Sequence, residues 1–187
     1  LGTVKPEHAT LVNDAYQEIY DNGFSEIVPL EKEQVAEHPT YVMTSQPVIR
    51  DDRHSTKCRI VINASLPDQK DKKKTLNKLL MPGKNLLPQI MELVLHSNLK
   101  EFIATIDIRK MFLSVRLSKE SDKDMLRYVW APPGSEKPVM YRFTCLPFGC
   151  VSSPYQAIWC LHETAKKWQD KYPKAAEIIL TKTYMDD

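Results

Sequence analysis

The chain has 187 residues, of which 42% are hydrophobic and 27% are charged, and its formal net charge is +2. This composition is typical of one compact globular unit with a sizeable core, and the small net charge does not by itself indicate a nucleic-acid-binding protein. No window approaches ~18 consecutive apolar residues and the amino end has no signal-peptide pattern, so we expect an intracellular protein that neither spans a membrane nor is secreted.

The first predicted element is a helix over residues 6–20. Apolar residues recur there at nearly helical spacing, at Val12, Ala15, Tyr16 and Ile19. The pair Asn22-Gly23 then supplies a stop signal.

Two short strands are predicted next, at residues 41–43 and 48–49, and a β-rich run follows at 58–62. The polar turn at Asp51-Asp52-Arg53 separates them, so the pattern indicates a hairpin with a charged tip. Farther along, Pro88 marks the start of a helix whose apolar residues, Ile90, Met91, Leu93, Val94 and Leu95, predict a face packed on the core.

Four more strand candidates follow, at residues 102–106, 114–117, 125–130 and 139–144, and they predict an antiparallel sheet. Ser153-Pro154 begins a further helix that extends to Trp168. The change from helix to strand before Tyr184 has no clear position. We expect the three tryptophans to pack in the core, at Trp130, Trp159 and Trp168.

The four cysteines, Cys58, Cys145, Cys150 and Cys160, have no Cys-x-x-Cys spacing and no histidines at zinc-finger distance. We therefore expect reduced, buried thiols. Lysines cluster in two stretches, at residues 70–78 and 166–174. A solvated face is the simplest interpretation of such a run, and only a position near a site would make these residues phosphate contacts.

Carboxylates follow two predicted strands. Asp107 closes the run at 102–106, and Asp186-Asp187 closes the last apolar run of the chain. If these strands are neighbours, three carboxylates meet at one edge of the sheet, where two Mg²⁺ ions ~4 Å apart would bind the attacking and leaving oxygens of a displacement at phosphorus. An Asp-Asp pair alone is weak evidence, since Asp51-Asp52 is interpreted as a turn. The ordered set gains weight from the Leu-Pro-Phe-Gly sequence at 146–149 between the two strands.

The sequence Tyr-Met-Asp-Asp at 184–187 resembles the signature hairpin of reverse transcriptases. Residues 55–61, 107–117 and 146–154 resemble the fingers strand, the first acidic motif and the nucleotide-side loop of these enzymes. Among subfamilies the chain is most similar to the Bel/Pao class of long-terminal-repeat retrotransposons, through residues 47–50, 59–65, 76–80 and 126–130. Asn63 and Thr44-Ser45-Gln46 depart from the pattern of that class.

The resemblance implies roles for individual residues. Asp107 and Asp186 would be the main metal ligands, with Asp187 beside them and the backbone carbonyl of Ile108 as a further ligand. The expected ion is Mg²⁺, two per site, with Mn²⁺ as a possible substitute. Tyr184 and Met185 would position the primer end, although Tyr184 would equally well fill the inner face of the hairpin.

Nucleotide contacts also follow from the resemblance. Arg59 would bind the triphosphate bidentately, with help from Lys57 and from Arg53 or a nearby lysine. Phe112 would lie beneath the sugar and exclude a ribose 2′-hydroxyl, the alternative being a core aromatic. Phe148 would pack against the incoming nucleotide, and Gly149 would allow a close backbone approach.

These residues together predict an α+β fold, a polymerase palm with an antiparallel sheet backed by helices and β-rich fingers. We expect residues 1–187 to form one fragment of a reverse transcriptase domain, with about 1–100 mainly fingers and about 101–187 mainly palm, cut from a longer chain and lacking thumb and ribonuclease H. The expected partners are a primed RNA or DNA template, deoxynucleoside triphosphates and the remainder of a Gag-Pol-type polyprotein. Such enzymes act in cytoplasmic particles whose product reaches the nucleus. The alternatives are a catalytically inactive remnant that binds nucleic acid, and an RNA-dependent RNA polymerase.

Overall fold

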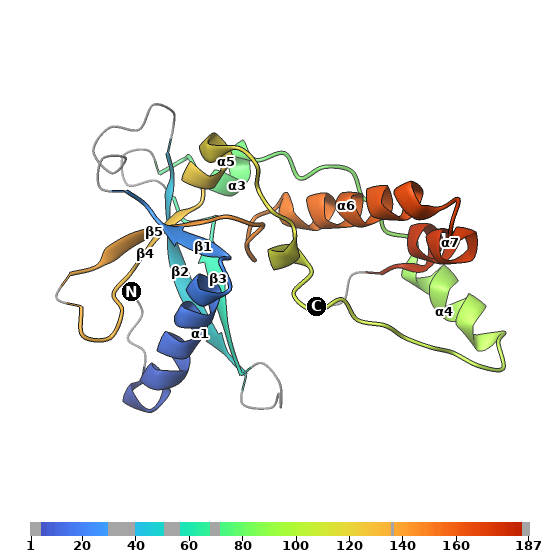
Figure 1. Cartoon of the computed structure of the whole chain (residues 1–187), viewed down its shortest axis with the longest axis horizontal. Coiled ribbons are helices and arrows are strands. Elements are labelled where there is room, and N and C mark those ends of the chain that lie inside the picture. The colour runs from blue at the N-terminus through green and yellow to red at the C-terminus, as the bar shows by residue number, and fades with distance from the viewer. Residues whose placement is uncertain (1–4, 30–39, 51–56, 68–71, 136, 185–187) are drawn as a thin grey trace. The chain divides into compact units, whose positions relative to one another are not determined.

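The computed structural model describes residues 5–29, 40–50, 57–67, 72–135 and 137–184 (Figure 1). The chain forms two compact units, each built from two separate stretches of sequence. The first comprises Leu1–Met81 with Phe112–Val151, and the second comprises Pro82–Met111 with Ser152–Asp187. None of the helices in the described ranges has the length and apolar character needed to cross a membrane.

The first unit is built on a five-stranded sheet with the order β1-β5-β4-β2-β3. Its strands are β1 (Ser25–Ile27), β2 (Val42–Ile49), β3 (Cys58–Asn63), β4 (Arg127–Trp130) and β5 (Val139–Phe143). Three of the pairings are antiparallel, but β2 pairs with β4 in parallel through Val42 and Met43. The sheet is therefore mixed. The predicted strands at 125–130 and 139–144 pair antiparallel as expected, whereas the parallel pairing of β2 with β4 was not predicted.

Short helices surround this sheet in the first unit: η1 (Pro6–His8), α1 (Ala9–Asp21), α3 (Leu76–Leu79), η2 (Phe112–Ser114) and α5 (Glu120–Asp124). The second unit contains three helices among its described residues: α4 (Ile90–Asn98), α6 (Ser153–Trp168) and α7 (Pro173–Lys182). The predicted helices at 6–20 and from 153 to 168 are confirmed. The apolar run at 178–180 belongs to a helix, which ends with extended backbone at Thr183.

The predicted hairpin is confirmed as β2 and β3, although the two short strands expected at 41–43 and 48–49 form one continuous strand. Pro47 lies within that strand and has no N–H to donate. It is tolerated because β4 pairs only with Val42 and Met43, so one side of β2 needs no strand partner at Pro47.

Two predicted strands are wrong. Residues 102–106 have no regular secondary structure, and Phe102 and Ile106 are 85% and 93% exposed. Residues 114–117 form the end of η2 and a single bridge from Arg116 to Cys145. A β-prone run becomes a strand only when a partner supplies its hydrogen bonds, and the composition of the run does not identify that partner.

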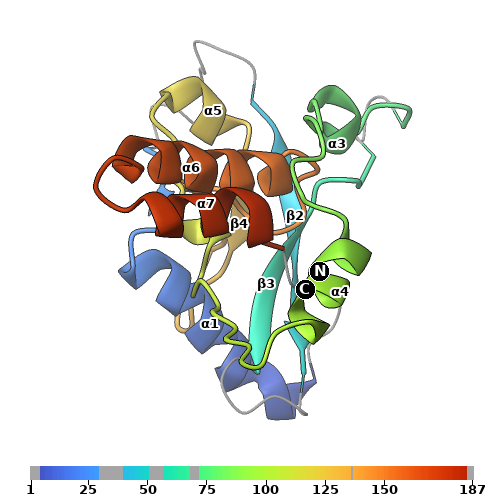
Figure 2. The same ribbon diagram turned by 90° about the vertical axis from the view of Figure 1, so that its right-hand side faces the viewer.

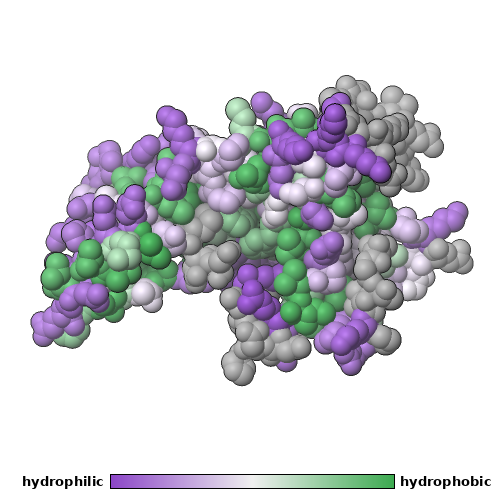
Figure 3. All heavy atoms as spheres, turned by 180° about the vertical axis from the view of Figure 1, so that it is seen from behind, coloured by the Kyte–Doolittle hydropathy of each residue, from purple (hydrophilic) through white to green (hydrophobic). Residues whose placement is uncertain are grey.

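The apolar face of α4 is also uncovered. The predicted helix is present, but none of its residues is buried, so the expectation that it faces the core is wrong. Its exposed apolar side chains include Ile90, Met91, Val94 and Leu95. They contribute to the hydrophobic surface of the second unit (Figure 3, lower left).

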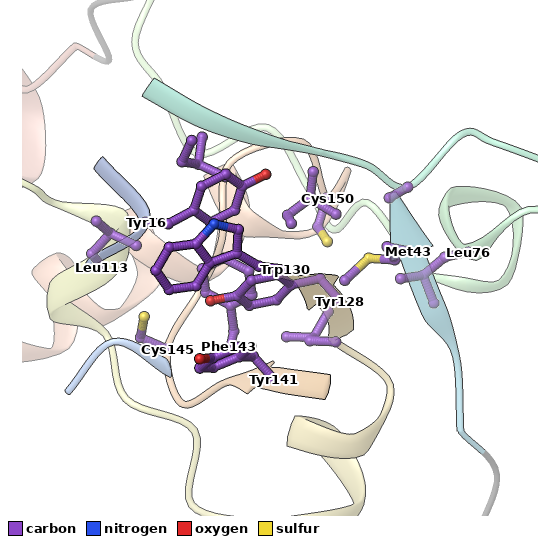
Figure 4. Packing of buried hydrophobic residues seen from close by; sticks show 14 of the residues in the cluster. Tyr16, Met43, Leu76, Leu113, Tyr128, Trp130, Tyr141, Phe143, Cys145 and Cys150 are labelled. Atoms are coloured by element: carbon purple, nitrogen blue, oxygen red, sulfur yellow. The ribbon is translucent and has the colours of Figure 1, made fainter. Parts of the chain in front are cut away.

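Aromatic rings fill the core of the first unit. Tyr16 of α1 stacks on Trp130 with ring centroids 5.1 Å apart, and Tyr128 packs against both Tyr141 and Phe143 (Figure 4). The buried hydroxyls have partners: the Tyr16 hydroxyl lies 2.6 Å from the Ser45 hydroxyl, and that of Tyr128 donates to Ser25 at 2.9 Å. Trp130 is a core residue as predicted, whereas the predictions for Trp159 and Trp168 are wrong, because both are 48% exposed.

A charged network crosses the same sheet. Arg127 and Arg142 lie directly opposite each other on β4 and β5, and both donate to the carboxylate of Asp124, at 2.9 and 2.8 Å. All three side chains are buried, with Asp124 only 1% exposed. Arg142 also donates to Glu26 at 2.8 Å and to Glu120.

The pKa values of the network reflect these bonds. Burial alone would lower the pKa of Arg142, but its hydrogen bonds to Asp124, Glu120 and Glu26 raise it overall. Hydrogen bonds from Lys123 and Arg142 lower the pKa of Glu120 to about 2. Glu120 and Arg142 therefore stay charged at neutral pH.

Replacement of Asp124 by asparagine should destabilise the fold, because two buried guanidinium groups would lose the carboxylate between them. We expect Asp124→Asn to lower the free energy of unfolding by about 3–5 kcal/mol, measured by urea denaturation at pH 7. The control is Asp122→Asn, an exposed carboxylate on the same helix, which should change stability by less than about 0.5 kcal/mol. Equal stabilities of the two variants would contradict the role given to Asp124.

Candidate active site

The β2–β3 hairpin carries the predicted phosphate-binding cations. Along β3, buried Cys58, Ile60 and Ile62 alternate with half-buried residues, so Arg59 lies on the face opposite the core. Arg59 pairs across the hairpin with Val48, and among the described residues no carboxylate lies within ion-pair distance of it. Lys57 is exposed just before the strand. The hairpin therefore holds both of these predicted cations, Arg59 and Lys57, outside the core, while Arg53 lies outside the described residues.

Backbone hydrogen bonds hold the Leu-Pro-Phe-Gly loop to β3 and to Val115. The amide of Ile62 donates to the carbonyl of Phe148 at 3.0 Å, and the amide of Leu146 donates to the carbonyl of Val115 at 3.1 Å. Gly149 has φ +106°, and a β-carbon there would lie 1.9 Å from the carbonyl oxygen of Ile62. Only glycine fits this close approach.

Two aromatic rings expected at the nucleotide meet beside this loop. Phe112, at the start of η2, contacts Phe148 edge to face, with ring centroids 5.1 Å apart and an interplanar angle of 63°. Both rings are half-buried, so each keeps some surface for a ligand. The structure thus brings together two predicted contacts that lie 36 residues apart in the sequence (148 minus 112).

Asn77 was missed by the sequence analysis as a residue that holds this loop. Its side-chain amide donates to the carbonyl of Gly149 at 3.1 Å and to the hydroxyl of Ser65 at 2.9 Å, and it accepts from the amide of Val151 at 2.9 Å. The sequence carries one signal for this role. Asparagine is a weak helix former, and one placed inside a four-residue helix often makes hydrogen bonds outside that helix.

Only some of the predicted metal ligands lie within the described residues. Asp107 and Ile108 are exposed, in a segment of the second unit without regular structure, and Tyr184 is exposed after α7. Met185, Asp186 and Asp187 lie outside the described residues, so the convergence of the three carboxylates stays a prediction. Within the described ranges there is no group of three or more His, Cys, Asp or Glu residues that could hold a metal ion.

The cysteines near the loop are structural. Burial raises the pKa of Cys145 to about 12 and that of Cys150 to about 11, so both thiols stay protonated at neutral pH. All four cysteines are free, and three of them are buried as predicted, whereas Cys160 is partly exposed.

Comparison with known proteins gives one family. Residues 49–187 match the family model described as "Reverse transcriptase (RNA-dependent DNA polymerase)", a span that contains β3, the Phe112–Phe148 contact and all three predicted catalytic aspartates. A search of curated proteins finds no match.

The close approach at Gly149 can be tested by adding one carbon. We expect Gly149→Ala to destabilise the protein by clearly more than the about 1–2 kcal/mol that left-handed backbone alone costs an alanine, because its β-carbon would overlap the Ile62 carbonyl. Gly134→Ala is the matched control, since Gly134 has φ +81° but no atom within 4 Å of an added carbon. If urea denaturation shows that both variants lose a similar amount of stability, then the overlap with the Ile62 carbonyl costs little free energy.

Proposed function

The chain belongs to the reverse transcriptase (RNA-dependent DNA polymerase) family, and we propose that it adds deoxynucleotides to a primer 3′-hydroxyl, releasing pyrophosphate. The observation that carries this proposal is the contact between Phe112 and Phe148, together with the bond from Ile62 to the loop. These two contacts join the Phe112 segment, the Leu-Pro-Phe-Gly loop and β3 within the first unit. Each of these motifs was expected to touch the incoming nucleotide.

In this proposal Arg59 binds the triphosphate. A planar guanidinium offers paired N–H donors that match phosphate oxygens, and it offsets the negative charge that grows on the leaving pyrophosphate. Its position on the outer face of β3 supports the role, because the core does not use its charge. Lys57 would add a second, more mobile positive charge.

Phe112 would select the sugar. Its ring is held by the edge of Phe148, and an edge-to-face pair of this kind contributes about 0.5–1.5 kcal/mol beyond its buried area. A ring fixed in this way excludes an added 2′-hydroxyl by steric overlap, and deoxynucleotides would be preferred. Phe148 and Gly149 would form the adjoining wall of the nucleotide site.

Reverse transcriptase domains generally use divalent metal ions, and the aspartates of this chain supply the hard oxygen donors that Mg²⁺ prefers. Asp107, Asp186 and Asp187, with the carbonyl of Ile108, would hold two Mg²⁺ ions, for which Mn²⁺ would substitute. When bound, the ions would lower the pKa of the primer 3′-hydroxyl and neutralise the triphosphate. Tyr184 and Met185 would position the primer end.

The biological setting is proposed from resemblance alone. A Bel/Pao-type retrotransposon would encode the chain as part of a Gag-Pol-type polyprotein. The fingers would lie toward the amino end of the chain and the palm toward its carboxyl end. The enzyme would act in cytoplasmic particles. The second candidate is a catalytically inactive remnant that binds nucleic acid.

Primer extension separates these two candidates. With an RNA template, deoxynucleoside triphosphates and Mg²⁺, we expect extension that falls at least about 100-fold in Asp107→Asn and in Asp186→Asn, since a lost metal ligand removes several kcal/mol of transition-state stabilisation. Omission of Mg²⁺ should have the same effect. Asp122→Asn, which changes an exposed carboxylate of the first unit, should extend normally. A folded protein that binds primer-template but extends nothing would favour the remnant.

Sugar selection gives a separate test of Phe112. We expect Phe112→Ala to lower the ratio of kcat/KM for deoxynucleotides over ribonucleotides by about 10-fold or more, because a missing ring is worth about 1–3 kcal/mol of discrimination. This ratio needs no separate control, because a general loss of folding or activity lowers kcat/KM for both kinds of nucleotide together. An unchanged ratio would remove the role of Phe112 and would favour an RNA-dependent RNA polymerase if ribonucleotides are the better substrates throughout.

A further inference from the structure

The second unit has a groove that the proposed active site does not use. Helices α6 and α7 lie side by side (Figure 2) and border an open hollow of about 460 Å³. Its lining includes Trp168, Lys171 and Tyr172 together with Ala165 and Ala176, which are buried. A hollow of this size is in the range of small-molecule and cofactor sites.

The two aromatic rings in this groove are exposed, and a lysine ammonium lies beside them. Trp168 and Tyr172 are 48% and 51% exposed, with ring centroids 6.4 Å apart. The ammonium of Lys171 lies 5.8 Å from the Trp168 ring and 5.1 Å from the Tyr172 ring. These contacts hold a positive charge beside aromatic surface that remains open to solvent.

The surrounding charge favours an anionic ligand. Residues 166–177 contain four lysines and two carboxylates, Asp170 and Glu177, a net charge of +2 (4 minus 2). Lys166 is paired with Glu163, at 2.7 Å, while Lys167 and Lys174 have no carboxylate within ion-pair distance among the described residues. The lysine stretch that was predicted to be a solvated face thus lies beside the two exposed rings of Trp168 and Tyr172.

Trp159 provides an internal comparison. It lies on the same helix as Trp168 and is equally exposed. Nine residues separate the two, which is a rotation of 900° about the helix axis, so Trp159 lies on the opposite side of α6. Among the described contacts, Trp159 has no neighbouring ring and no cation. The grouping at Trp168 is therefore not a general property of exposed tryptophans on this helix.

We propose that the α6–α7 groove, defined by Trp168, Lys171 and Tyr172, binds single-stranded nucleic acid, with a base stacked on the exposed rings and a phosphate held by Lys171. Aromatic platforms beside lysines are the features that bind single strands without sequence preference. The proposal rests on the proposed function only for its ligand class, because a polymerase handles unpaired template. The residues of the groove are different from those proposed to bind the incoming nucleotide.

Binding of a fluorescein-labelled 12-nucleotide oligo(dT) to the whole chain, followed by anisotropy at low salt, tests the groove. We expect Trp168→Leu to weaken binding about 10-fold, since stacking on one aromatic side chain is worth about 1–3 kcal/mol per base. Lys171→Gln should weaken binding severalfold and reduce its salt dependence, because one phosphate contact is lost. Trp159→Leu, the matched control, should bind within about twofold of the unchanged chain, and urea denaturation verifies that each variant folds.

Tryptophan fluorescence locates the base. Unlabelled oligo(dT) should quench the emission of the Trp159→Leu variant, which retains Trp168, and should leave that of Trp168→Leu nearly unchanged. Equal effects of the two substitutions, or no binding by the unchanged chain, would overturn the proposal. So would a dimer in sedimentation velocity that Trp168→Leu dissociates, because the groove would then be an interface between copies.

The two proposals fail in different experiments. Normal primer extension together with oligo(dT) binding that is independent of Trp168 overturns the groove alone. Absent extension together with binding that depends on Trp168 overturns the polymerase activity alone.

Discussion

The carbonyl oxygen of Ile62 occupies the space that any β-carbon on residue 149 would need, and the proposed nucleotide site depends on that close approach. Because Gly149 permits it, the amide of Ile62 reaches the carbonyl of Phe148 and joins β3 to the loop. Phe148 then holds the ring of Phe112, and Asn77 fixes the loop from the other side. The cation Arg59 lies on the same strand as Ile62, so one backbone contact connects the residues proposed to bind phosphate and to select the sugar.

The loop in turn follows β5, whose register is set by charge. Two arginines directly opposite on neighbouring strands would repel each other, and a buried carboxylate between them reverses the sign of that interaction. A slip of β5 by one residue would move Arg142 to the other face of the sheet, away from Asp124 and Glu26. The network therefore specifies one alignment of β5 and, through it, the start of the Leu-Pro-Phe-Gly loop. A buried ion network is a weak source of net stability but an effective source of such specificity.

The sequence predicted the local elements better than their partners. The hairpin, α1 and α6 follow from short-range signals that the chain carries within each element: alternation, helical spacing, and a Ser-Pro start. The parallel pairing of β2 with β4, the bonds of Asn77 and the carboxylate shared by two arginines join residues far apart in sequence or on separate elements, and no local pattern encodes them. Family resemblance supplied Arg59, Phe112 and Phe148 as site residues, but only the structure shows that Phe112 and Phe148 touch.

The wrong predictions of burial share one cause. Periodicity identifies which side of α4 or α6 is apolar, yet burial depends on whether another surface covers that side. On α4 and at residues 102–106 the apolar side chains remain exposed, whereas Trp130 is covered by the rings of Tyr16 and Tyr141. An apolar face is stabilised by about 25 cal/mol per Å² when another surface covers it, and the sequence does not say whether such a surface is present. Trp168 differs from these side chains because Lys171 lies beside its ring, and that positive charge is the reason for proposing a negatively charged ligand there.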